Sequence, residues 1–235
     1  MPVIATAGWS IPKSVAAAFP DTGSALQRYA SVFTGTEINS TFYRRHKPST
    51  FERWAETTPE NFRFAIKLPK QITHRDRMND IREPFAAFLR NISPLGHKRG
   101  PLLCQLPPSL RFDPEIVSSS FDTMRNLDEG PIVIEARHRS WSCQEAIMLI
   151  KRFAIDRVLA DPDLVWEASS FSCQPRYIRL HGKPKIYHSS YSPEDILSIL
   201  QILAPSGWCV FDNTASGAAI KNALAMAKNL NWLPK

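Results

Sequence analysis

About eight short apolar runs in this chain end in a polar or ionisable cluster, and this repeated ending restricts the fold more than any other feature. The clusters are Gly8-Trp9-Ser10, Glu37-Ile38-Asn39-Ser40, Lys67, Gln105-Leu106-Pro107-Pro108, Glu135-Ala136-Arg137-His138, Asp161-Pro162-Asp163, Arg179-Leu180-His181-Gly182 and Asp212-Asn213-Thr214. Parallel barrel strands are buried on both faces, so they read as continuous apolar runs, and their C-terminal ends deliver side chains to one rim. The pattern therefore predicts a functional site at one rim of a parallel barrel.

Longer helical patterns alternate with these runs along the chain. We expect strands at residues 3–7, 34–38, 63–67, 102–106, 132–135, 157–160, 177–180 and 208–211. We expect helices at residues 25–31, 49–56, 82–91, 114–127, 143–153, 193–204 and 217–229. The alternation predicts an α/β fold, a single TIM-like (β/α)8 barrel formed as one domain by residues 1–235. Residues 161–176 show no helical pattern, so we expect a loop or short turn there and an irregular barrel between strands six and seven.

The composition favours a water-soluble chain with a sizeable core. Hydrophobic residues make up 43% of it, and no apolar run reaches the roughly 18–20 residues of a membrane span. The N-terminus reads as a first strand and not as a signal peptide. The four cysteines form no CxxC pair, which disfavours a zinc site or a disulfide framework. We therefore expect a cytoplasmic protein without a membrane partner; no feature specifies an oligomeric state.

The formal net charge of +7 is unevenly distributed. Residues 1–117 carry 16 Lys and Arg against 10 Asp and Glu, whereas the remainder carries 13 against 12. A positive field favours an anionic small molecule or nucleic acid as partner. The alternative is a moderately basic surface, because the sequence shows no dense Lys/Arg tract or helix stripe.

The cluster after the second strand and the residues after the third can carry chemistry. Alternation along the second strand sends Glu37 and Asn39 to one face, where a carboxylate can act as a base, bind a metal or orient an arginine. The alternative for Glu37 is a rim ion pair with Arg137 or Arg179. Lys67 is an anchor for phosphate or carboxylate, or a base when desolvated. His74 lies in a loop that either folds over the rim or is simply solvated.

The cluster after the fifth strand is the densest. Glu135 and Arg137 share a strand face, and the planar fork of an arginine suits carboxylate or phosphate. His138 can transfer protons near neutral pH. Trp141 can stack on a sugar or base, or it can close over the following helix as a structural residue.

The seventh and eighth strands repeat this arrangement. Arg179 and His181 face the same way, and Asp212 follows the eighth strand immediately before a helix. A helix N-terminus after strand eight is a common phosphate site in such barrels. The alternative is that Asp212 or Ser216 only caps that helix.

Read together, these segments resemble a known family. The matching segments are Ala7-Gly8-Trp9, Glu37-Ile38-Asn39-Ser40-Thr41-Phe42-Tyr43, Phe64-Ala65-Ile66-Lys67 with Ile72-Thr73-His74, Gly100-Pro101-Leu102-Leu103 with Gln105-Leu106-Pro107-Pro108, Glu135-Ala136-Arg137-His138-Arg139-Ser140-Trp141, Tyr177-Ile178-Arg179-Leu180-His181-Gly182, and Asp212-Asn213-Thr214 with Gly217 and Asn222-Ala223. In this order they resemble domain of unknown function 72. The resemblance implies a TIM-like barrel and supplies no settled activity. Ala136 departs from it, because the family usually has an aromatic residue there, which bears on substrate fit.

These observations predict an enzyme that acts on an anionic, phosphate-bearing substrate by hydrolysis or elimination at the C-terminal mouth of the barrel. The alternative is a non-catalytic nucleic-acid or phosphometabolite binding module. We expect catalytic groups among Glu37, Glu135, His138, His181 and Asp212. We expect substrate contacts from Trp9, Asn39, Tyr43, Lys67, His74, Gln105, Arg137, Trp141, Arg179 and Asn213.

Cofactors are predicted from what the sequence lacks. It contains no glycine-rich dinucleotide fingerprint and no P-loop, so no nucleotide cofactor is expected. Glu37, Glu135, His138, Asp161, His181 and Asp212 are the candidates to hold a divalent metal. A metal is not favoured, because no HxH or HExxH spacing occurs and an arginine-rich mouth repels cations.

Overall fold

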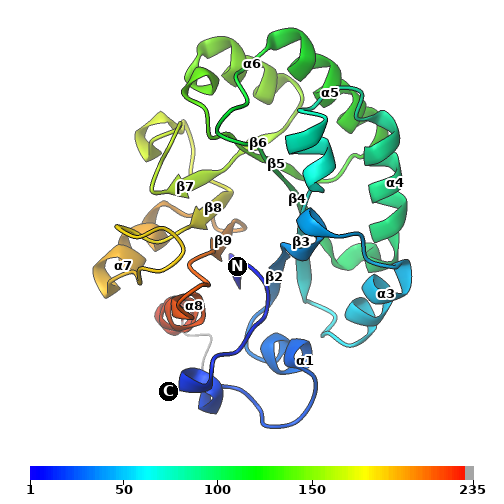
Figure 1. Ribbon diagram of the computed structural model, residues 1–235. Coiled ribbons are helices and arrows are strands. Elements are labelled where there is room, and N and C mark those ends of the chain that lie inside the picture. The colour runs from blue at the N-terminus through cyan, green and yellow to red at the C-terminus, as the bar shows by residue number, and fades with distance from the viewer. Residues whose placement is uncertain (231–235) are drawn as a thin grey trace.

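The computed structural model describes residues 1–230 as an α/β fold whose strands form a ring (Figure 1). The strands are β1 (Val3–Thr6), β2 (Gly35–Ile38), β3 (Arg63–Lys67), β4 (Arg99–Gln105), β5 (Ile132–Glu135), β6 (Asp156–Arg157), β7 (Leu159–Asp161), β8 (Tyr177–Leu180) and β9 (Trp208–Phe211). They form two sheets, in the orders β1-β9-β8-β7 and β2-β3-β4-β5-β6, and the neighbouring strands of both sheets run parallel.

The two sheets meet at two seams. At the first seam Ala7 forms a parallel bridge with Glu37, and Gly8 N donates to Glu37 O at 2.8 Å. At the second seam β6 and β7 are separated along the chain only by Val158, whose N donates to Ile134 O at 2.9 Å. The predicted TIM-like α/β architecture is confirmed, and the predicted sixth strand is divided at Val158.

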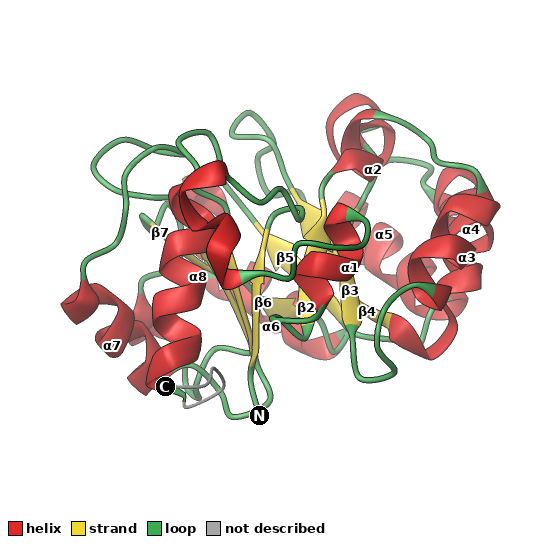
Figure 2. Cartoon of the chain, turned by 90° about the horizontal axis from the view of Figure 1, so that it is seen from below, coloured by secondary structure: helices red, strands yellow, loops and turns green. Residues whose placement is uncertain are grey.

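Helices surround the strands on the outside (Figures 1 and 2). The α-helices are α1 (Ala25–Ala30), α2 (Ser40–Tyr43), α3 (Pro48–Glu56), α4 (Arg82–Ile92), α5 (Pro114–Leu127), α6 (Gln144–Arg152), α7 (Pro193–Ile202) and α8 (Ala218–Asn229). Shorter turns are η1 (Lys13–Ala18), η2 (Gln71–Arg75), η3 (Ser93–Lys98), η4 (Arg139–Ser142) and η5 (Ala168–Ser170). Between β7 and β8 only the short turn η5 occurs, as the sequence predicts. Within residues 1–230, no helix has the length and apolar character needed to cross a bilayer.

Local sequence explains where the main helices begin. Ser192 Oγ accepts a hydrogen bond from Asp195 N, and Asp195 Oδ2 accepts one from Ser192 N, which is a reciprocal cap at the start of α7. Asp113 accepts from the N–H groups of Glu115 and Ile116 at the start of α5, with Pro114 in the first turn. These two boundaries therefore fall where the capping residues predict.

The inner face of the strand ring has an apolar layer below a polar one. The apolar layer contains Ala5, Ala65, Leu103, Val133, Val158, Tyr177, Trp208 and Val210, whereas the larger apolar cluster packs the strands against the helices. Two residues further along five of these strands stand Lys67, Gln105, Glu135, Arg179 and Asp212, all buried. Because side chains alternate with a period of two, the same inward face becomes polar at the C-terminal end of each of these five strands.

Close packing in the apolar layer gives a test of the fold. A Cβ atom at Gly100 in β4 would lie 2.8 Å from Cζ2 of Trp208 and 3.1 Å from Phe64 O. We expect Gly100→Ala to lower the free energy of unfolding by roughly 1–3 kcal/mol through overpacking. Adding Trp208→Phe removes the atom that is approached most closely, so the double variant should be more stable than the sum of the two single changes predicts. Urea unfolding of the four proteins measures this coupling, and strict additivity would contradict the packing described.

Candidate active site

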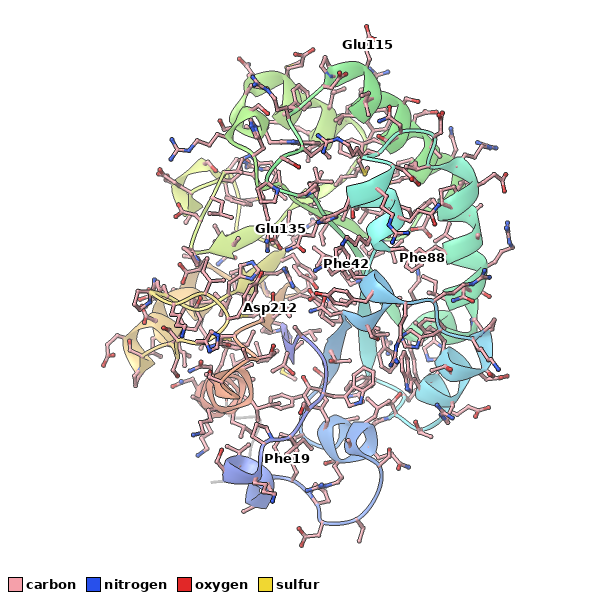
Figure 3. All side chains as sticks on the ribbon, in the orientation of Figure 1. Phe19, Phe42, Phe88, Glu115, Glu135 and Asp212 are labelled. Atoms are coloured by element: carbon pink, nitrogen blue, oxygen red, sulfur yellow. The ribbon has the colours of Figure 1, made fainter. Side chains whose placement is uncertain are left out.

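Arg179 of β8 lies at the centre of the mouth and is fully buried. Its guanidinium donates twice to Glu37, from Nε to Oε2 at 3.0 Å and from Nη2 to Oε1 at 2.8 Å. It also donates from Nη1 to Glu135 Oε2 at 2.7 Å and from Nη2 to Asp212 Oδ2 at 3.0 Å. One planar cation therefore holds three carboxylates, which belong to β2 and β5 or directly follow β9. Glu135 and Asp212 are labelled near the middle of the ring in Figure 3.

The two glutamates of this cluster are fully engaged by protein groups. Glu37 Oε2 also accepts a hydrogen bond from Tyr177 Oη at 2.8 Å. Glu135 Oε1 accepts from Gln105 Nε2 at 3.0 Å and from Arg137 Nε at 3.0 Å. Burial alone would raise the pKa of Glu135, but Arg179, followed by His181 and Arg137, holds this pKa well below its ordinary value. Glu135 is therefore a buried anion, and both glutamates orient their neighbours.

His181 connects two of the carboxylates. Its Nδ1 lies 3.0 Å from Asp212 Oδ2, and its Nε2 lies 3.2 Å from Glu135 Oε1. Burial favours the neutral imidazole, but Glu135 and Asp212 outweigh it and raise the pKa of His181. The pKa of Asp212 is lowered, because Arg179 and His181 overcome the opposing effect of burial. The second oxygen of Asp212, Oδ1, accepts no hydrogen bond from the described residues, and the side chain is 11% exposed.

Lys67, at the end of β3, differs from every other charged group of the mouth. The residue is 8% exposed, and its Nζ lies 4.4 Å from the centroid of the Phe42 ring. Among residues 1–230 its ammonium has no hydrogen-bond or ion-pair partner. Burial, reinforced by the charge of Arg179, lowers the pKa of Lys67 to about 8 against the opposing influence of the carboxylates. A buried cation without a counter-ion is a site for an anion.

Arg137 and Tyr187 form the rim beside this cation. The Arg137 side chain is 18% exposed, and its Nη2 donates to Tyr187 Oη at 3.4 Å. The Tyr187 ring stands edge-on to His181, with centroids 5.8 Å apart. Tyr187 has a φ of 67°, an uncommon conformation for a tyrosine, so its placement over the mouth depends on the surrounding loop.

The His74 ring packs edge-on against the Phe42 ring, with ring centroids 4.8 Å apart. Its Nδ1 is 2.8 Å from Thr73 Oγ1. Burial, together with the positive charges of Lys67, Lys70 and Arg137, lowers the pKa of His74. The neutral imidazole of His74 is therefore favoured, because the ring is partly buried and lies close to several positive charges, that of Lys67 included.

Two predicted site residues serve local structure. Trp141 is fully buried, and its Nε1 donates to Leu110 O at 3.0 Å, so no face of the ring is open to a ligand. This is the structural alternative that the sequence left open. His138 accepts a hydrogen bond at Nδ1 from Ser140 N at 3.1 Å and thereby caps η4. His138 makes no hydrogen bond to the carboxylate cluster.

Four more predicted contact residues occupy different positions. Asn39 and Asn213 each have a buried Oδ1 without a hydrogen-bond partner among the described residues, so both oxygens remain available as acceptors. Trp9 packs edge-on against Trp54, with centroids 5.0 Å apart. Tyr43 is 79% exposed and stands edge-on to Phe42. Of the predicted site residues, the structure brings together at the mouth Glu37, Lys67, Gln105, Glu135, Arg137, Arg179, His181 and Asp212. Trp141 and His138 instead make hydrogen bonds within the neighbouring loops.

The structure changes the role expected for Arg179. The sequence predicts an anion anchor at the rim, but the guanidinium is fully buried and four of its N–H groups are directed to carboxylates. The guanidinium therefore lies between the three carboxylates and contacts all of them. Within residues 1–230 there is no group of three or more His, Cys, Asp or Glu arranged to hold a metal ion.

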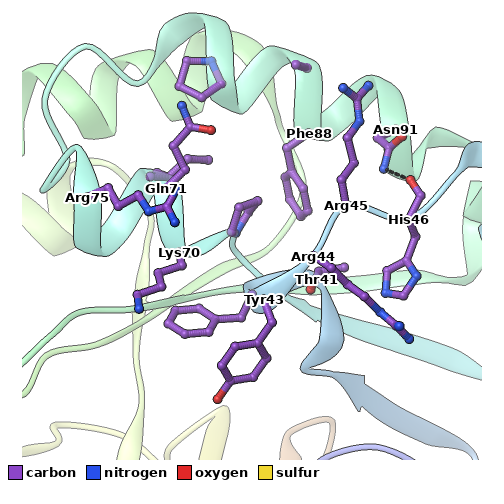
Figure 4. Close-up of a pocket in the computed structure, with 15 residues that line it drawn as sticks. Thr41, Tyr43, Arg44, Arg45, His46, Lys70, Gln71, Arg75, Phe88 and Asn91 are labelled. Atoms are coloured by element: carbon purple, nitrogen blue, oxygen red, sulfur yellow. Dashed lines mark hydrogen bonds between the residues drawn. The ribbon is translucent and has the colours of Figure 1, made fainter.

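A second feature was missed by the sequence analysis. A cavity of about 420 Å³ opens beside the mouth, between α2, η2 and α4 (Figure 4). We call it the basic pocket; it is lined by Thr41, Phe42, Tyr43, Arg44, Arg45, His46, Pro69, Lys70, Gln71, Ile72, Arg75, Pro84, Ala87, Phe88 and Asn91. The run Arg44-Arg45-His46-Lys47 is a short basic tract, and it is the signal in the sequence that could have revealed the pocket.

Comparison with known proteins gives a consistent family. The family model described as "Protein of unknown function DUF72" matches residues 3–235. UPF0759 protein YecE from Escherichia coli (strain K12) is 32% identical over 131 residues, which is 55% of this chain and 46% of YecE. UPF0759 protein YunF from Bacillus subtilis (strain 168) is 29% identical over 144 residues, covering 59% of this chain and 51% of YunF. The chain thus matches about half the length of these curated relatives.

Several solved structures resemble the fold of this protein over almost the whole chain. A DUF72 family protein from Thermotoga maritima MSB8 has 25% identity and a TM-score of 0.79, covering 98% of this chain and 100% of that one. A DUF72 family protein from Enterococcus faecalis V583 has 22% identity and a TM-score of 0.80, covering 100% and 99%. SacUVDE has 11% identity and a TM-score of 0.58, covering 97% of this chain and 98% of its own, and shows likeness of fold alone.

The contacts of Arg179 predict that it stabilises the protein. We expect Arg179→Met to lower the free energy of unfolding at pH 7 by roughly 3–5 kcal/mol, because it leaves buried carboxylates without a partner. In the parent, the lowered pKa values of Glu135 and Asp212 contribute stability above pH 4 that is lost as these groups are protonated. In the variant, falling pH instead neutralises unpaired anions. The difference in free energy of unfolding between the parent and Arg179→Met should therefore narrow from pH 7 toward pH 4.

Urea unfolding at several pH values measures this difference. Arg137→Met is the matched control, since Arg137 contacts one carboxylate and is partly exposed, and we expect it to cost less than half as much. Arg179→Lys should not restore stability, because one ammonium cannot reproduce four hydrogen bonds in a plane. A variant Arg179→Met as stable as the parent would contradict this account of the cluster.

Proposed function

The chain belongs to the DUF72 family, and we propose that the barrel mouth is the active site of an enzyme that acts on an anionic, phosphate-bearing substrate by hydrolysis or elimination. One observation carries the proposal. Among the described residues, Lys67 is a buried ammonium without a counter-ion, and it stands beside a cluster whose three carboxylates are balanced by Arg179, Arg137 and His181. The mouth therefore carries a positive charge that the carboxylate cluster does not balance, next to groups that can move a proton.

Lys67 and Arg137 hold the phosphate in this proposal. The Lys67 ammonium supplies a point charge, and the exposed edge of Arg137 supplies N–H donors that Glu135 does not use. A desolvated cation interacts more strongly with a developing negative charge than a solvated one, because water does not screen it. The two cations thus bind the substrate and stabilise charge that forms on the phosphate oxygens.

Asp212 accepts the proton, and His181 helps to hold the carboxylate in place. In hydrolysis, Oδ1 of Asp212 takes a proton from the water that attacks phosphorus while the ester P–O bond breaks and the alcohol leaves. In elimination, it takes a proton from the carbon adjacent to the one that carries the phosphate, while the C–O bond to the leaving phosphate breaks. Oδ2 stays bound to Arg179 Nη2 and His181 Nδ1, which fix the orientation of the carboxylate. Glu37 and Glu135 do not contact the substrate and position Arg179 and His181.

The alternative is a binding module without catalysis. It is favoured by one observation: each oxygen of Glu37 and Glu135 already accepts hydrogen bonds from the protein. In this alternative the carboxylates only balance Arg179. Replacement of Asp212 separates the two functions.

Sulfate binding tests the anion site, because sulfate keeps its charge throughout the range of interest. We expect affinity to be constant up to about pH 7.5 and then to fall by about tenfold per pH unit above the Lys67 pKa of about 8. The sign follows from the ammonium form, which is present below this pKa and is the form that binds. Isothermal titration calorimetry of the full chain between pH 6.5 and 9.5 measures it; affinity independent of pH would contradict the role of Lys67.

Lys67→Met and Lys98→Met form a matched pair. Lys98 is also buried, but its Nζ donates to Ala55 O at 2.6 Å and to Thr58 O at 2.7 Å, and it precedes β4 at the other end of the barrel. We expect Lys67→Met to weaken sulfate binding by roughly 1.5–3 kcal/mol. It should leave stability at pH 7 unchanged or higher, since it removes a buried charge that has no partner. Lys98→Met should lower stability by roughly 1–3 kcal/mol and leave sulfate affinity unchanged.

Asp212→Asn tests catalysis separately from binding. We expect hydrolysis of a chromogenic phosphate ester by the parent, and a loss of about 100-fold or more in the variant, the typical contribution of a general base. Sulfate affinity should be retained or increased, because the change removes a negative charge from the mouth. Equal rates in the parent and Asp212→Asn would exclude this base and favour the binding module.

A further inference from the structure

The basic pocket is an accumulation of positive charge without balancing carboxylates. Among the described residues, Arg44, Arg45, Lys70 and Arg75 form no ion pair, and neither Asp nor Glu lines the cavity. Side chains of like charge that surround one cavity repel each other, which costs free energy in the unbound protein. An anion with several charges relieves this repulsion. The pocket is therefore suited to a polyanion.

Local structure explains why these cations gather. Arg44 and Arg45 directly follow α2, while Lys70 and Arg75 lie at the two ends of η2. Figure 4 shows Lys70 and Arg75 on one side of the cavity and Arg44 and Arg45 on the other, with Tyr43 below. The backbone next to Arg44 and Arg45 is held to α4 by a hydrogen bond from Asn91 Nδ2 to His46 O at 2.6 Å. The cations are thus placed around the cavity and not along one edge of it.

Aromatic side chains connect the pocket with the mouth. Phe42 lines the pocket and also carries the Lys67 ammonium over its ring. Tyr43 stands edge-on to Phe42, with centroids 4.9 Å apart, and is 79% exposed. An exposed ring bordered by arginines is the arrangement on which bases of unpaired nucleic acid stack while their phosphates contact the cations.

From this geometry we infer that the basic pocket binds single-stranded nucleic acid, with Tyr43 stacking on a base and Arg44, Arg45 and Arg75 contacting successive phosphates. The inference rests on the proposed function in one respect, since the strand then continues across Phe42 to Lys67 in the mouth. A small phosphate ester would occupy the mouth alone and would require neither the four unpaired cations nor the exposed ring. A duplex would keep its bases paired and could not use Tyr43 in this way.

Fluorescence anisotropy of a fluorescein-labelled oligomer of ten deoxythymidines tests the inference on the full chain. We expect the parent to bind the oligomer with an affinity that falls as salt concentration rises. The slope of log affinity against log salt concentration should become shallower by roughly 1.4 in the double variant Arg44→Ala/Arg45→Ala, because each lost phosphate contact contributes about 0.7 for a single strand. Lys151→Ala/Arg152→Ala is the matched control, since it removes two exposed charges from α6 and should leave the slope unchanged. We expect Tyr43→Ala to weaken binding about tenfold, and Tyr43→Phe to retain it.

Three results would overturn the inference. One is an oligonucleotide affinity that is equal in the parent, Arg44→Ala/Arg45→Ala and Tyr43→Ala. Another is tighter binding of the matching duplex than of the single strand. The third is displacement of the labelled oligonucleotide by inorganic phosphate at concentrations as low as those of unlabelled oligonucleotide.

Lys67→Met distinguishes failure of the pocket inference from failure of the proposed function. If sulfate binding depends on Lys67 but the pocket variants have no effect on oligonucleotide binding, the mouth proposal stands and the pocket inference is wrong.

Discussion

The mouth of this barrel depends on the contact of one guanidinium with three carboxylates. Without Arg179, three negative side chains from different strands would be buried close together, and the cost of desolvating them would oppose closure of the strand ring. With Arg179, the same side chains are fixed in direction by hydrogen bonds. Their charges then set the protonation of His181 and Asp212. The stability of the inner polar layer and the chemistry available at its surface therefore have one origin.

Once this cluster is balanced, the charges that remain are positive. Within residues 1–230 Lys67 has no counter-ion, Arg137 is partly exposed, and the basic pocket adds four cations beyond Phe42. The mouth is therefore asymmetric, with a balanced acidic side and an unbalanced basic side. In the function we propose, catalysis belongs to the first side and anion binding to the second. This asymmetry also explains why the cluster after β5, which is the densest in the sequence, is not the part of the mouth most open to a ligand.

Period-two alternation and strand endings were sufficient to predict the TIM-like α/β architecture and to place the side chains of Glu37, Glu135 and Arg179 on its inner face. They succeeded because a strand buried on both faces leaves few alternatives for Glu37, Glu135 or Arg179. The roles were harder to predict, because they depend on which side chains meet across the ring. Sequence spacing places Arg179 at a strand end but does not show that three carboxylates use its donors. The basic pocket was missed because α2 and η2 are too short to give a periodic signal, and its cations come from separate loops.

The stacking of a polar layer on an apolar one inside the ring has a consequence for how such chains can vary in length. Each inward polar residue stands two positions after an inward apolar one, as in Val133 and Glu135 or Tyr177 and Arg179. Deletion of one residue within a strand would turn the polar side chain outward, toward the helices, and bring an apolar one to the mouth. Insertions and deletions are therefore tolerable in the loops and helices, where the two layers keep their register. Longer relatives of this chain should carry their additional length there.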